Sequence, residues 1–479
     1  MTDVVGKLWG FCHVLRHDGI DYGDYIEQIT YLLFLKMADE RGIALPEGYD
    51  WKTLREKSGM ELTNFYVDLL RQLGHQEGLL GDIFNGAISR FTNPVNLKRL
   101  INLIDETEWT SLNVDVKAEA YEGLLEKAAS EGKKGAGQYF TPRILIQSIV
   151  RCMQPDPRVS NDFTICDPAA GTGGFLVSSY EWLIEQTGGA LRREDAERIT
   201  KRTYYGTELV RRPRRLCLMN LFLHGLEADI YLGDSLYEPA PNRRYDVVLT
   251  NPPFGTKGAN QAPVRDDFTI STSNKQLNFV QHLMTILKPG GRAAIVLPDN
   301  CLFSDQAGDV FQLLMEDCDL HTILRLPRGT FTPYSPGVKA NVAFFTKGRK
   351  TKNVWIFDAR TNVPGITKKE RPLTPEYFKE FEECYGPDPN VVSTSALETR
   401  EEMAKKTERF KKYSLEKIQQ RNYNLDITWI TDESLEDADE LPEPDELAGE
   451  AITHLEAAID GLQEVVRLLG SNSNNSGGV

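Results

Sequence analysis

The chain has 479 residues, 41% of them hydrophobic, and is therefore long enough for two or three domains with separate cores. No apolar segment reaches the roughly 18 residues that cross a bilayer, and the N-terminus lacks a basic stretch followed by an apolar run. We therefore expect no membrane span, no signal peptide and a cytoplasmic location. The formal net charge of −15 argues against tight binding of nucleic acid by this chain alone, because phosphate contacts need a surplus of Lys and Arg.

Residues 1 to about 130 are predicted to be helical, because apolar side chains recur there at a helical spacing. The recurring residues are Leu8, Phe11 and Leu15, then Ile26, Ile29, Leu33 and Met37, then Phe65, Leu69 and Leu73. Gly and Pro breaks near 42–48 and at Pro94 separate the helices. The segment contains no chemical motif and is typical of a helical domain that packs on a neighbour or lines a groove.

From residue 138 to about 350, short β-rich runs alternate with amphipathic helices. The predicted strands are Phe163–Cys166, Tyr204–Thr207, Ile230–Leu232, Asp246–Leu249, Arg292–Leu297, Thr322–Leu326 and Asn341–Phe345. The predicted helices between them include Phe175–Gln186, Arg214–Leu223 and Lys275–Leu287. This alternation predicts parallel βαβ units in a doubly wound α/β sheet.

After Lys350 the pattern weakens, and we expect a charged helix over about 398–412. Ten acidic residues and no basic residue lie between Asp432 and Glu450, and the chain without them carries −5. A last helix is predicted over about 447–470, with a heptad seam of Ile452, Leu455, Ile459, Leu462, Val466 and Leu469. The seam slightly favours a partner helix over packing on the chain's own core. The Ser-, Asn- and Gly-rich tail after it is expected to be disordered.

These segments predict three parts. Residues 1–130 form an all-α N-terminal domain, 131–400 form the α/β domain, and 401–479 form a helical C-terminal extension with the acidic linker and the tail. The flexible basic stretch from Glu131 to Gly137 marks the first junction. The seven cysteines and seven histidines are dispersed without metal-ligand or redox spacing, so we expect buried reduced thiols and no metal site.

The first motif that carries chemistry is DPAAGTGGF, from Asp167 to Phe175, directly after the first predicted strand. Its glycines let the backbone approach a ligand, and the helix that follows presents free amides. Glu208 and Asp234 end the next two predicted strands. A carboxylate at the second strand end can accept ribose hydroxyls. Three carboxylates at successive strand ends suit a nucleoside that carries an amine and no phosphate.

The second motif, Asn251-Pro252-Pro253-Phe254, follows an apolar predicted strand and decides the chemistry. An amine on an aromatic ring is a poor nucleophile, because its lone pair is delocalised into the ring. Asn251 Oδ1 and the Pro252 carbonyl can accept its two N–H groups and so free the lone pair, while Phe254 stacks on the base. No general base is needed beforehand, since the amine can lose its proton after the transfer.

The two motifs in this order resemble the amino-methyltransferases that act on adenine in DNA. The segments GQYFTPR (137–143), SNKQLNF (273–279), Gly291–Pro298 and Gly337–Phe345 extend the resemblance. With the helical N-terminus, residues 1 to about 430 are similar to the modification subunit of Type I restriction–modification systems. The resemblance implies a Rossmann-like methyltransferase sheet, S-adenosylmethionine as cofactor, and transfer of its methyl group to N6 of adenine in DNA.

The resemblance also implies residue roles. Asn251, Pro252 and Phe254 would be catalytic, and the target base would flip out of the duplex to reach them. Phe331 is a looser candidate for stacking on the base's other face and fits an ordinary core position equally well. The implied cofactor-binding residues are Tyr139, Phe140 and Thr141 over the methionine end, Asp167, Gly171, Thr172 and Gly173 at the methionine part, Glu208 at the ribose, and Asp234 at the adenine amine.

The implied partners explain the acidic charge. A specificity subunit would read the DNA sequence, a second copy of this chain would help clamp the duplex, and a restriction subunit would join them. Two basic stretches, Arg211–Arg215 and Arg349–Lys352, are either DNA contacts or solvated surfaces. The loop from Gly255 to Thr272, with Lys257 and Arg265, is a cover, a DNA contact or a disordered insertion.

Two alternatives stay open at this point. The Asn-Pro-Pro-aromatic turn also occurs in enzymes that methylate protein glutamine, ribosomal guanine or cytosine N4. The GQYFTP segment and the long helical N-terminus favour DNA adenine. An alternative of a different class is a non-catalytic scaffold that has kept the fold. The intact glycine loop and Asn251 argue against it.

Overall fold

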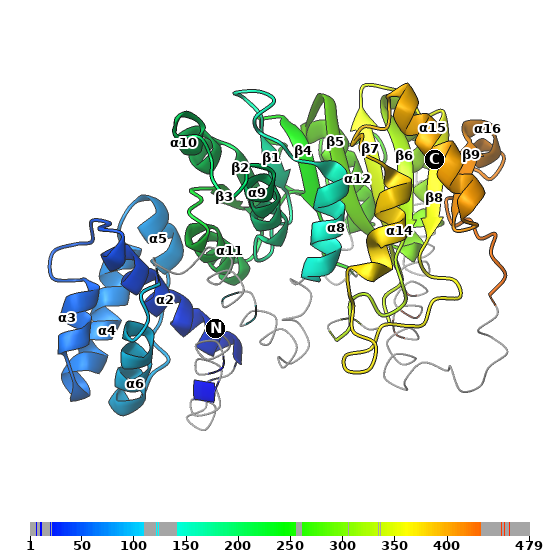
Figure 1. Ribbon diagram of the computed structural model, residues 1–479. Helices are drawn as coiled ribbons and strands as arrows, with labels where there is room; N and C mark the ends of the chain where they lie inside the picture. The colour runs from blue at the N-terminus through cyan, green and yellow to red at the C-terminus, as the bar shows by residue number, and fades with distance from the viewer. Residues whose placement is uncertain are drawn as a thin grey trace, which may run out of the picture. The chain divides into compact units, whose positions relative to one another are not determined.

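The structure is a computed structural model that describes residues 22–109, 141–254 and 261–432, apart from 305, 334 and 336, together with positions 6, 10, 11, 20, 121, 123, 452, 455 and 459 (Figure 1). Its contacts group the chain into two units. The first comprises Met1–Phe140, Ala170–Val177 and Arg192–Leu232, and the second comprises Thr141–Ala169, Ser178–Leu191 and Gly233–Val479. The three-part division at 130 and 400 remains a proposal.

The N-terminal part of the first unit is helical, as predicted. Its helices are α2 (Tyr22–Glu40) and α4 (Gly59–Gly74), which carry two of the predicted apolar spacings, and α3 (Trp51–Glu56), α5 (Gly78–Phe84) and α6 (Pro94–Asp105), which the spacing did not single out. The predicted face of α2 is in the core, where Ile29 and Met37 are fully buried. Local chemistry sets the helix starts, because Asp50 caps α3 and Asn93 caps α6, whose first residue is Pro94.

The first unit continues with α10 (Arg193–Arg202), β2 (Tyr204–Glu208), α11 (Arg211–Leu223) and β3 (Asp229–Leu232). The two strands are parallel, and Glu208 lies opposite Leu232 at their carboxyl ends. The sequence therefore predicted this strand pair and the helix between its strands correctly.

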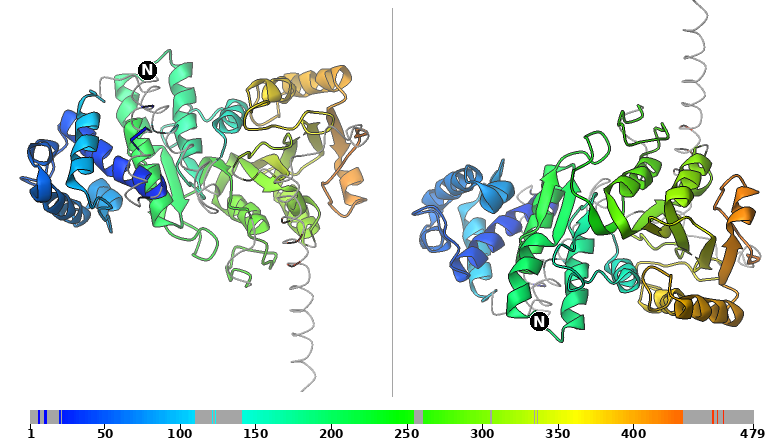
Figure 2. Two further views of the ribbon diagram at one scale, coloured as in Figure 1. Left: turned by 90° about the horizontal axis from the view of Figure 1, so that it is seen from below. Right: turned by 90° about the horizontal axis from the view of Figure 1, so that it is seen from above.

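The second unit contains most of the sheet and the remaining helices. Its elements are α8 (Arg143–Met153), β1 (Ile165–Asp167), β4 (Tyr245–Thr250), α12 (Lys275–Ile286), β5 (Leu287–Pro298), η2 (Asp299–Leu302), α13 (Ala307–Asp317), β6 (Cys318–Arg325), β7 (Ala340–Lys347), β8 (Asn353–Asp358), α14 (Glu376–Tyr385), α15 (Thr394–Lys406), β9 (Phe410–Ser414) and α16 (Leu415–Gln419). Helix α9 (Gly174–Gln186) follows β1 in the chain. Helices α8, α14 and α15 cover one face of the second unit's sheet, and α12 and α13 cover the other (Figure 2).

The strand order is β3-β2-β1-β4-β5-β7-β6-β8-β9. The α/β fold and the seven predicted strands are confirmed, with three differences. Strand β7 runs antiparallel to β5 and β6, so the sheet is mixed and not wholly parallel. Strands β8 and β9 were not predicted, and the helix expected over 398–412 ends at Lys406. Residues 410–414 form a strand because they pair with β8, where the Phe410 ring stacks on Trp355 at 4.9 Å.

Strand direction gives the second unit two distinct edges. Strands β4, β5, β6 and β8 run in one direction, because β7 is antiparallel to both β5 and β6 while β6 and β8 are parallel. The loops that follow these four strands therefore leave from one edge, which we call the carboxyl edge. The turn from β7 to β8 lies at the opposite edge, the amino edge. In open α/β sheets ligands bind at the carboxyl edge.

The described residues also test the expectations about the cysteines and the C-terminal helix in part. The six described cysteines are buried and free of disulfides. Ile452, Leu455 and Ile459 of the predicted heptad are helical and 47%, 62% and 51% exposed. The rest of that helix, the acidic segment after Asp432 and the tail lie outside the described residues. No helix within the described part of the chain is long and apolar enough to cross a membrane.

Candidate active site

The catalytic motif forms the turn after β4 at the carboxyl edge. Residues 247–249 of β4 are fully buried, and Asn251 follows at once after the strand. Asn251 Nδ2 donates a hydrogen bond of 2.9 Å to Thr141 Oγ1. Asn251 Oδ1 is buried and has no hydrogen-bond partner among the described residues. A buried acceptor left unpaired costs about 1–3 kcal/mol, so this atom is poised to receive a donor from a ligand.

A glutamine from helix α12 also binds this turn. Gln276 Nε2 donates to the Pro253 carbonyl oxygen at 2.7 Å, and the Gln276 side chain is buried. Asn274 caps the helix by accepting from the backbone N–H groups of Gln276 and Leu277. From the sequence this segment was recognisable only as part of the family resemblance, and the contact was not predicted. The available signal was an amide side chain in the first turn of a helix, directly after an Asn cap.

The two aromatic candidates meet at this turn. The Phe254 and Phe331 rings are 5.3 Å apart between centroids and edge to face, with an interplanar angle of 87°. Phe331 belongs to the loop that follows β6, and it is 3% exposed, whereas Phe254 is half-buried. The two rings are in direct contact, and the role of Phe331 in stacking on the base's other face remains a prediction.

Two of the predicted cofactor carboxylates lie together in the second unit. Asp167 is buried, and its Oδ1 accepts from the Ala169 N–H at 3.0 Å. Asp234 Oδ1 accepts from the backbone N–H groups of Leu236 and Tyr237, and within the described chain no hydrogen bond occupies Oδ2. Ser235 Oγ donates to the Pro168 carbonyl at 2.6 Å, so the turn at Asp234 lies against the start of the glycine loop.

The third predicted carboxylate, Glu208, lies in the first unit at the end of β2. Its Oε2 accepts from the Gly171 N–H at 2.9 Å, and its Oε1 accepts from the Val210 N–H at 2.8 Å. Burial raises the pKa of Glu208, and the hydrogen bonds from backbone amides oppose that rise. Each oxygen keeps a further lone pair for a hydroxyl donor. Glu208 thus binds the backbone of the glycine loop at Gly171.

The glycine loop has geometry that a side chain would disturb. Gly171 and Gly173 have φ of 54° and 82°, in the left-handed region that favours glycine. A Cβ on Gly173 would lie 2.8 Å from Cys217 Sγ of α11. The Thr172 carbonyl accepts from Asn220 Nδ2, also of α11, at 3.1 Å. Tyr139 and Phe140, predicted to cover the cofactor, lie outside the described residues.

The first basic stretch is not a free phosphate-binding patch. Arg212 pairs with Asp24 at 2.5 Å, and Arg214 pairs with Asp82 at 3.0 Å. Arg215 is buried, pairs with Glu27 of α2, and donates to the carbonyls of residues 83 and 85. These contacts join α11 to α2 and α5 within the first unit. These ion pairs give Arg212, Arg214 and Arg215 a structural role within the first unit, and a role of this stretch in DNA contact remains untested.

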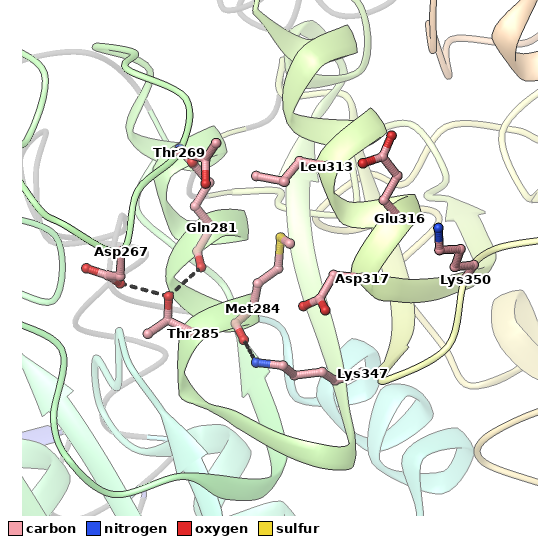
Figure 3. Close-up of a pocket in the computed structure, with 10 residues that line it drawn as sticks. All are labelled: Asp267, Thr269, Gln281, Met284, Thr285, Leu313, Glu316, Asp317, Lys347 and Lys350. Atoms are coloured by element: carbon pink, nitrogen blue, oxygen red, sulfur yellow. Dashed lines mark hydrogen bonds between the residues drawn. The ribbon is translucent and has the colours of Figure 1, made fainter.

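The second basic stretch, Arg349–Lys352, lies in the β7–β8 turn at the amino edge, away from the catalytic turn. A cleft of about 470 Å³ is found beside it and is lined by Asp267, Thr269, Gln281, Met284, Thr285, Leu313, Glu316, Asp317, Lys347 and Lys350 (Figure 3). The Lys347 ammonium donates to the Met284 carbonyl at the end of α12. Because the cleft lies towards the amino edge, it is not the site of the target base.

The loop expected over 255–272 is partly described, since residues 255–260 lie outside the described ranges. Arg265 has a side chain only 2% exposed and pairs with Asp267 at 2.6 Å. It also donates to the Ser235 carbonyl. The Gln281 side chain binds both backbone polar groups of Ile270 at 2.9 Å. These contacts hold residues 261–272 in place, and the buried Arg265 side chain does not favour the alternative in which the loop contacts DNA through this residue.

Comparison with known proteins places these features in a family. The chain matches the N-6 DNA Methylase family over residues 112–438 and the HsdM N-terminal domain over residues 4–42. The methylase subunit of the Type I restriction enzyme StySPI from Salmonella potsdam is 40% identical, over 98% of this chain and 96% of that protein. The EcoKI methylase subunit of Escherichia coli strain K12 is 39% identical over the same shares. A solved chain described in work on complex assembly and conformational transition of the type I R-M system is 27% identical, with a TM-score of 0.74 over 99% of both chains.

Proposed function

The chain belongs to the N-6 DNA methylase family, as a Type I restriction enzyme methylase subunit that methylates N6 of adenine in DNA, and we propose that S-adenosylmethionine is the methyl donor and that Asn251 activates the amine. The buried, unpartnered Oδ1 of Asn251 carries this proposal. It is an acceptor at the carboxyl edge of the sheet, where the N–H of a flipped adenine would supply the missing donor.

The residues present fit S-adenosylmethionine. This cofactor supplies an electrophilic methyl group whose bond to sulfur breaks as its bond to N6 forms. We assign Asp167, Gly171, Thr172 and Gly173 to its methionine part, on the grounds of the buried carboxylate and the left-handed glycines. Glu208 takes the ribose hydroxyls, and Asp234 accepts from the adenine amine through its open Oδ2. Tyr139 and Phe140 are assigned to the methionine end from the sequence motif alone.

The chain's own residues act on the target amine. Asn251 Oδ1 accepts one N6–H and the Pro252 carbonyl accepts the other, which withdraws the nitrogen lone pair from the ring. Phe254 stacks on the base and holds N6 at attack distance, and Phe331 lies beside it. Thr141 keeps the Asn251 amide turned so that Oδ1 faces the base. N6 gives up its extra proton to water once the transfer is complete.

We propose that the protein works in the cytoplasm in a complex with a specificity subunit, a second copy of itself and a restriction subunit. The net charge of −15 supports this, because a partner has to supply much of the affinity for DNA. The exposed apolar residues Ile452, Leu455 and Ile459 are candidates for a helix-to-helix contact with a partner. If a chain without residues 447–479 still assembled fully, the heptad would have no part in the complex.

The test is methyl transfer from labelled S-adenosylmethionine to DNA, by the chain alone and with the specificity subunit encoded beside it. We expect activity only with the partner, and we expect Asn251→Ala in that complex to be slower by about 100-fold or more. Cofactor binding should survive the substitution. Near-normal transfer by a folded, assembled Asn251→Ala complex would refute the mechanism. Activity of the chain alone would refute the need for a specificity subunit.

A further inference from the structure

The loop that joins β8 to α14 leaves the sheet at the same edge as the catalytic turn. Strands β4 and β8 point the same way, so the chain after Asp358 begins at the carboxyl edge, as does the chain after Thr250 (Figure 1). The base of the loop is fixed, because the guanidinium of buried Arg360 binds the Asp299 carboxylate and the Ala340 carbonyl. The start of the loop is therefore held at the carboxyl edge of the sheet.

The middle of this loop packs on the segment that carries Phe331. The Ile366 N–H donates to the Arg328 carbonyl at 2.9 Å, and Ile366 is buried. Gly329 has a φ of 75°, and a Cβ there would collide with the Ile366 carbonyl, so the two backbones touch. Phe331 follows two residues later and contacts Phe254. Ile366 is therefore connected to the catalytic turn through the segment 328–331.

The residues directly after Ile366 form a closed, basic turn. The Thr367 N–H donates to the Arg371 carbonyl at 2.9 Å, and the Arg371 N–H donates to Thr367 Oγ1 at 3.0 Å. Lys368, Lys369 and Arg371 are exposed, and none of them forms an ion pair with the described part of the chain. Glu370 is the single acidic residue in the turn. The turn thus presents a local excess of positive charge on a protein that is strongly acidic.

We propose that the turn 367–371 binds DNA phosphates beside the flipped adenine. The other two basic stretches are less suited to this purpose, because Arg212, Arg214 and Arg215 are ion-paired within the first unit and Arg349–Lys352 lie at the amino edge. Unpaired cations at the catalytic edge can replace condensed counterions on the duplex, which is the main source of phosphate affinity. The proposal rests on the active site proposed at Asn251, since that site defines where the adenine lies.

The test compares two triple variants in the complex with the specificity subunit. The first is Lys368→Ala, Lys369→Ala and Arg371→Ala. The matched control is Lys350→Ala, Lys352→Ala and Arg349→Ala, which likewise removes two lysines and one arginine, but from the amino edge. Affinity for a duplex that carries the recognition sequence is measured over a range of salt concentrations, together with S-adenosylmethionine binding and the transfer rate at saturating DNA.

We expect the loop variant to weaken DNA binding by roughly fivefold for each phosphate that it no longer binds at about 0.15 M salt, and to flatten the salt slope by about 0.9 per phosphate. The control variant should change neither quantity. Cofactor binding and the transfer rate at saturating DNA should stay as they are, which separates this result from a failure of the active-site proposal. Lys368→Arg and Lys369→Arg together should keep the affinity.

Three results would overturn the proposal. The first is an unchanged salt slope in the loop variant. The second is an equal weakening of DNA binding in both variants, which would mean that the affinity depends only on the overall charge of the chain. The third is failure of the loop variant alone to assemble with the specificity subunit, which would show that the turn binds protein and not DNA.

Discussion

The side-chain amide of Asn251 donates to the hydroxyl oxygen of Thr141 at 2.9 Å. The two residues are 110 positions apart in the chain, and Thr141 closes the GQYFT segment that was assigned to the cofactor. Because the Nδ2 group is engaged, Oδ1 is the atom left for the target amine. Under the proposed mechanism, the residue assigned to the cofactor would therefore also orient the Asn251 amide.

Thr141→Val should slow methyl transfer more than it weakens cofactor binding. Valine keeps the shape but removes the acceptor, so the Asn251 amide loses its fixed orientation and the rate falls by about 10- to 100-fold. Thr141→Ser keeps the hydroxyl and should restore most of the rate. Single-turnover transfer and calorimetric binding of S-adenosylmethionine separate the two effects. A loss confined to cofactor affinity would show that Thr141 serves the cofactor alone.

Gln276→Leu should reduce kcat with little change in S-adenosylmethionine affinity. The substitution leaves the Pro253 carbonyl without its donor, which costs about 1–3 kcal/mol of stability and loosens the catalytic turn. Gln281→Leu is the matched control, because Gln281 is also a buried glutamine of α12 but holds Ile270. It should lower the melting temperature comparably and leave kcat near normal. Equal losses of kcat in both variants would mean that Gln276 acts only through helix stability.

Gly173→Ala should lower both stability and cofactor affinity. A φ of 82° is unfavourable for alanine by about 1–2 kcal/mol, and the new methyl group would press on Cys217 Sγ. Gly188→Ala is the control, since Gly188 has a φ of 70° but open space around its Cβ position. Thermal unfolding should show a smaller loss for Gly188→Ala, and its cofactor binding should be normal. Normal cofactor affinity in Gly173→Ala would argue against the assignment of this loop.

Asp319→Asn should stabilise the protein at neutral pH. Burial raises the pKa of Asp319 to about 6, against the pull of Arg349, Arg400 and Lys352. The folded state thus binds this proton more tightly than the unfolded state does, so its contribution to stability falls as pH rises from about 4 to about 6. Denaturant unfolding should show a gain for the variant at pH 7.5 that disappears near pH 3.5. An equal gain at both pH values would mean that ionisation of Asp319 is not its cause.

The sequence by itself determined the class of fold and the place of both motifs within it. Strand–helix alternation and the Gly and Pro residues act over a few neighbouring positions, so they could be interpreted without knowledge of the rest of the chain. The chemistry of Asn251-Pro252-Pro253-Phe254 could also be interpreted locally, because the two groups that would accept the amine's N–H bonds lie within one turn. The sequence also placed Asp167, Glu208 and Asp234 at or just after the ends of predicted strands, because each comes at the end of a short β-rich run.

Only the tertiary structure decided which distant groups meet. Thr141 and Gln276 reach the catalytic turn from other elements, and no local pattern indicates such contacts. The charge of Arg211–Arg215 looked free in the sequence, but acidic residues of α2 and α5 lie against it in the fold. The antiparallel direction of β7 places Arg349–Lys352 at the amino edge. Strand β8 then runs back, so the turn 367–371 follows at the carboxyl edge. Strand pairing is a non-local property, and it placed these positive charges at opposite edges of the sheet.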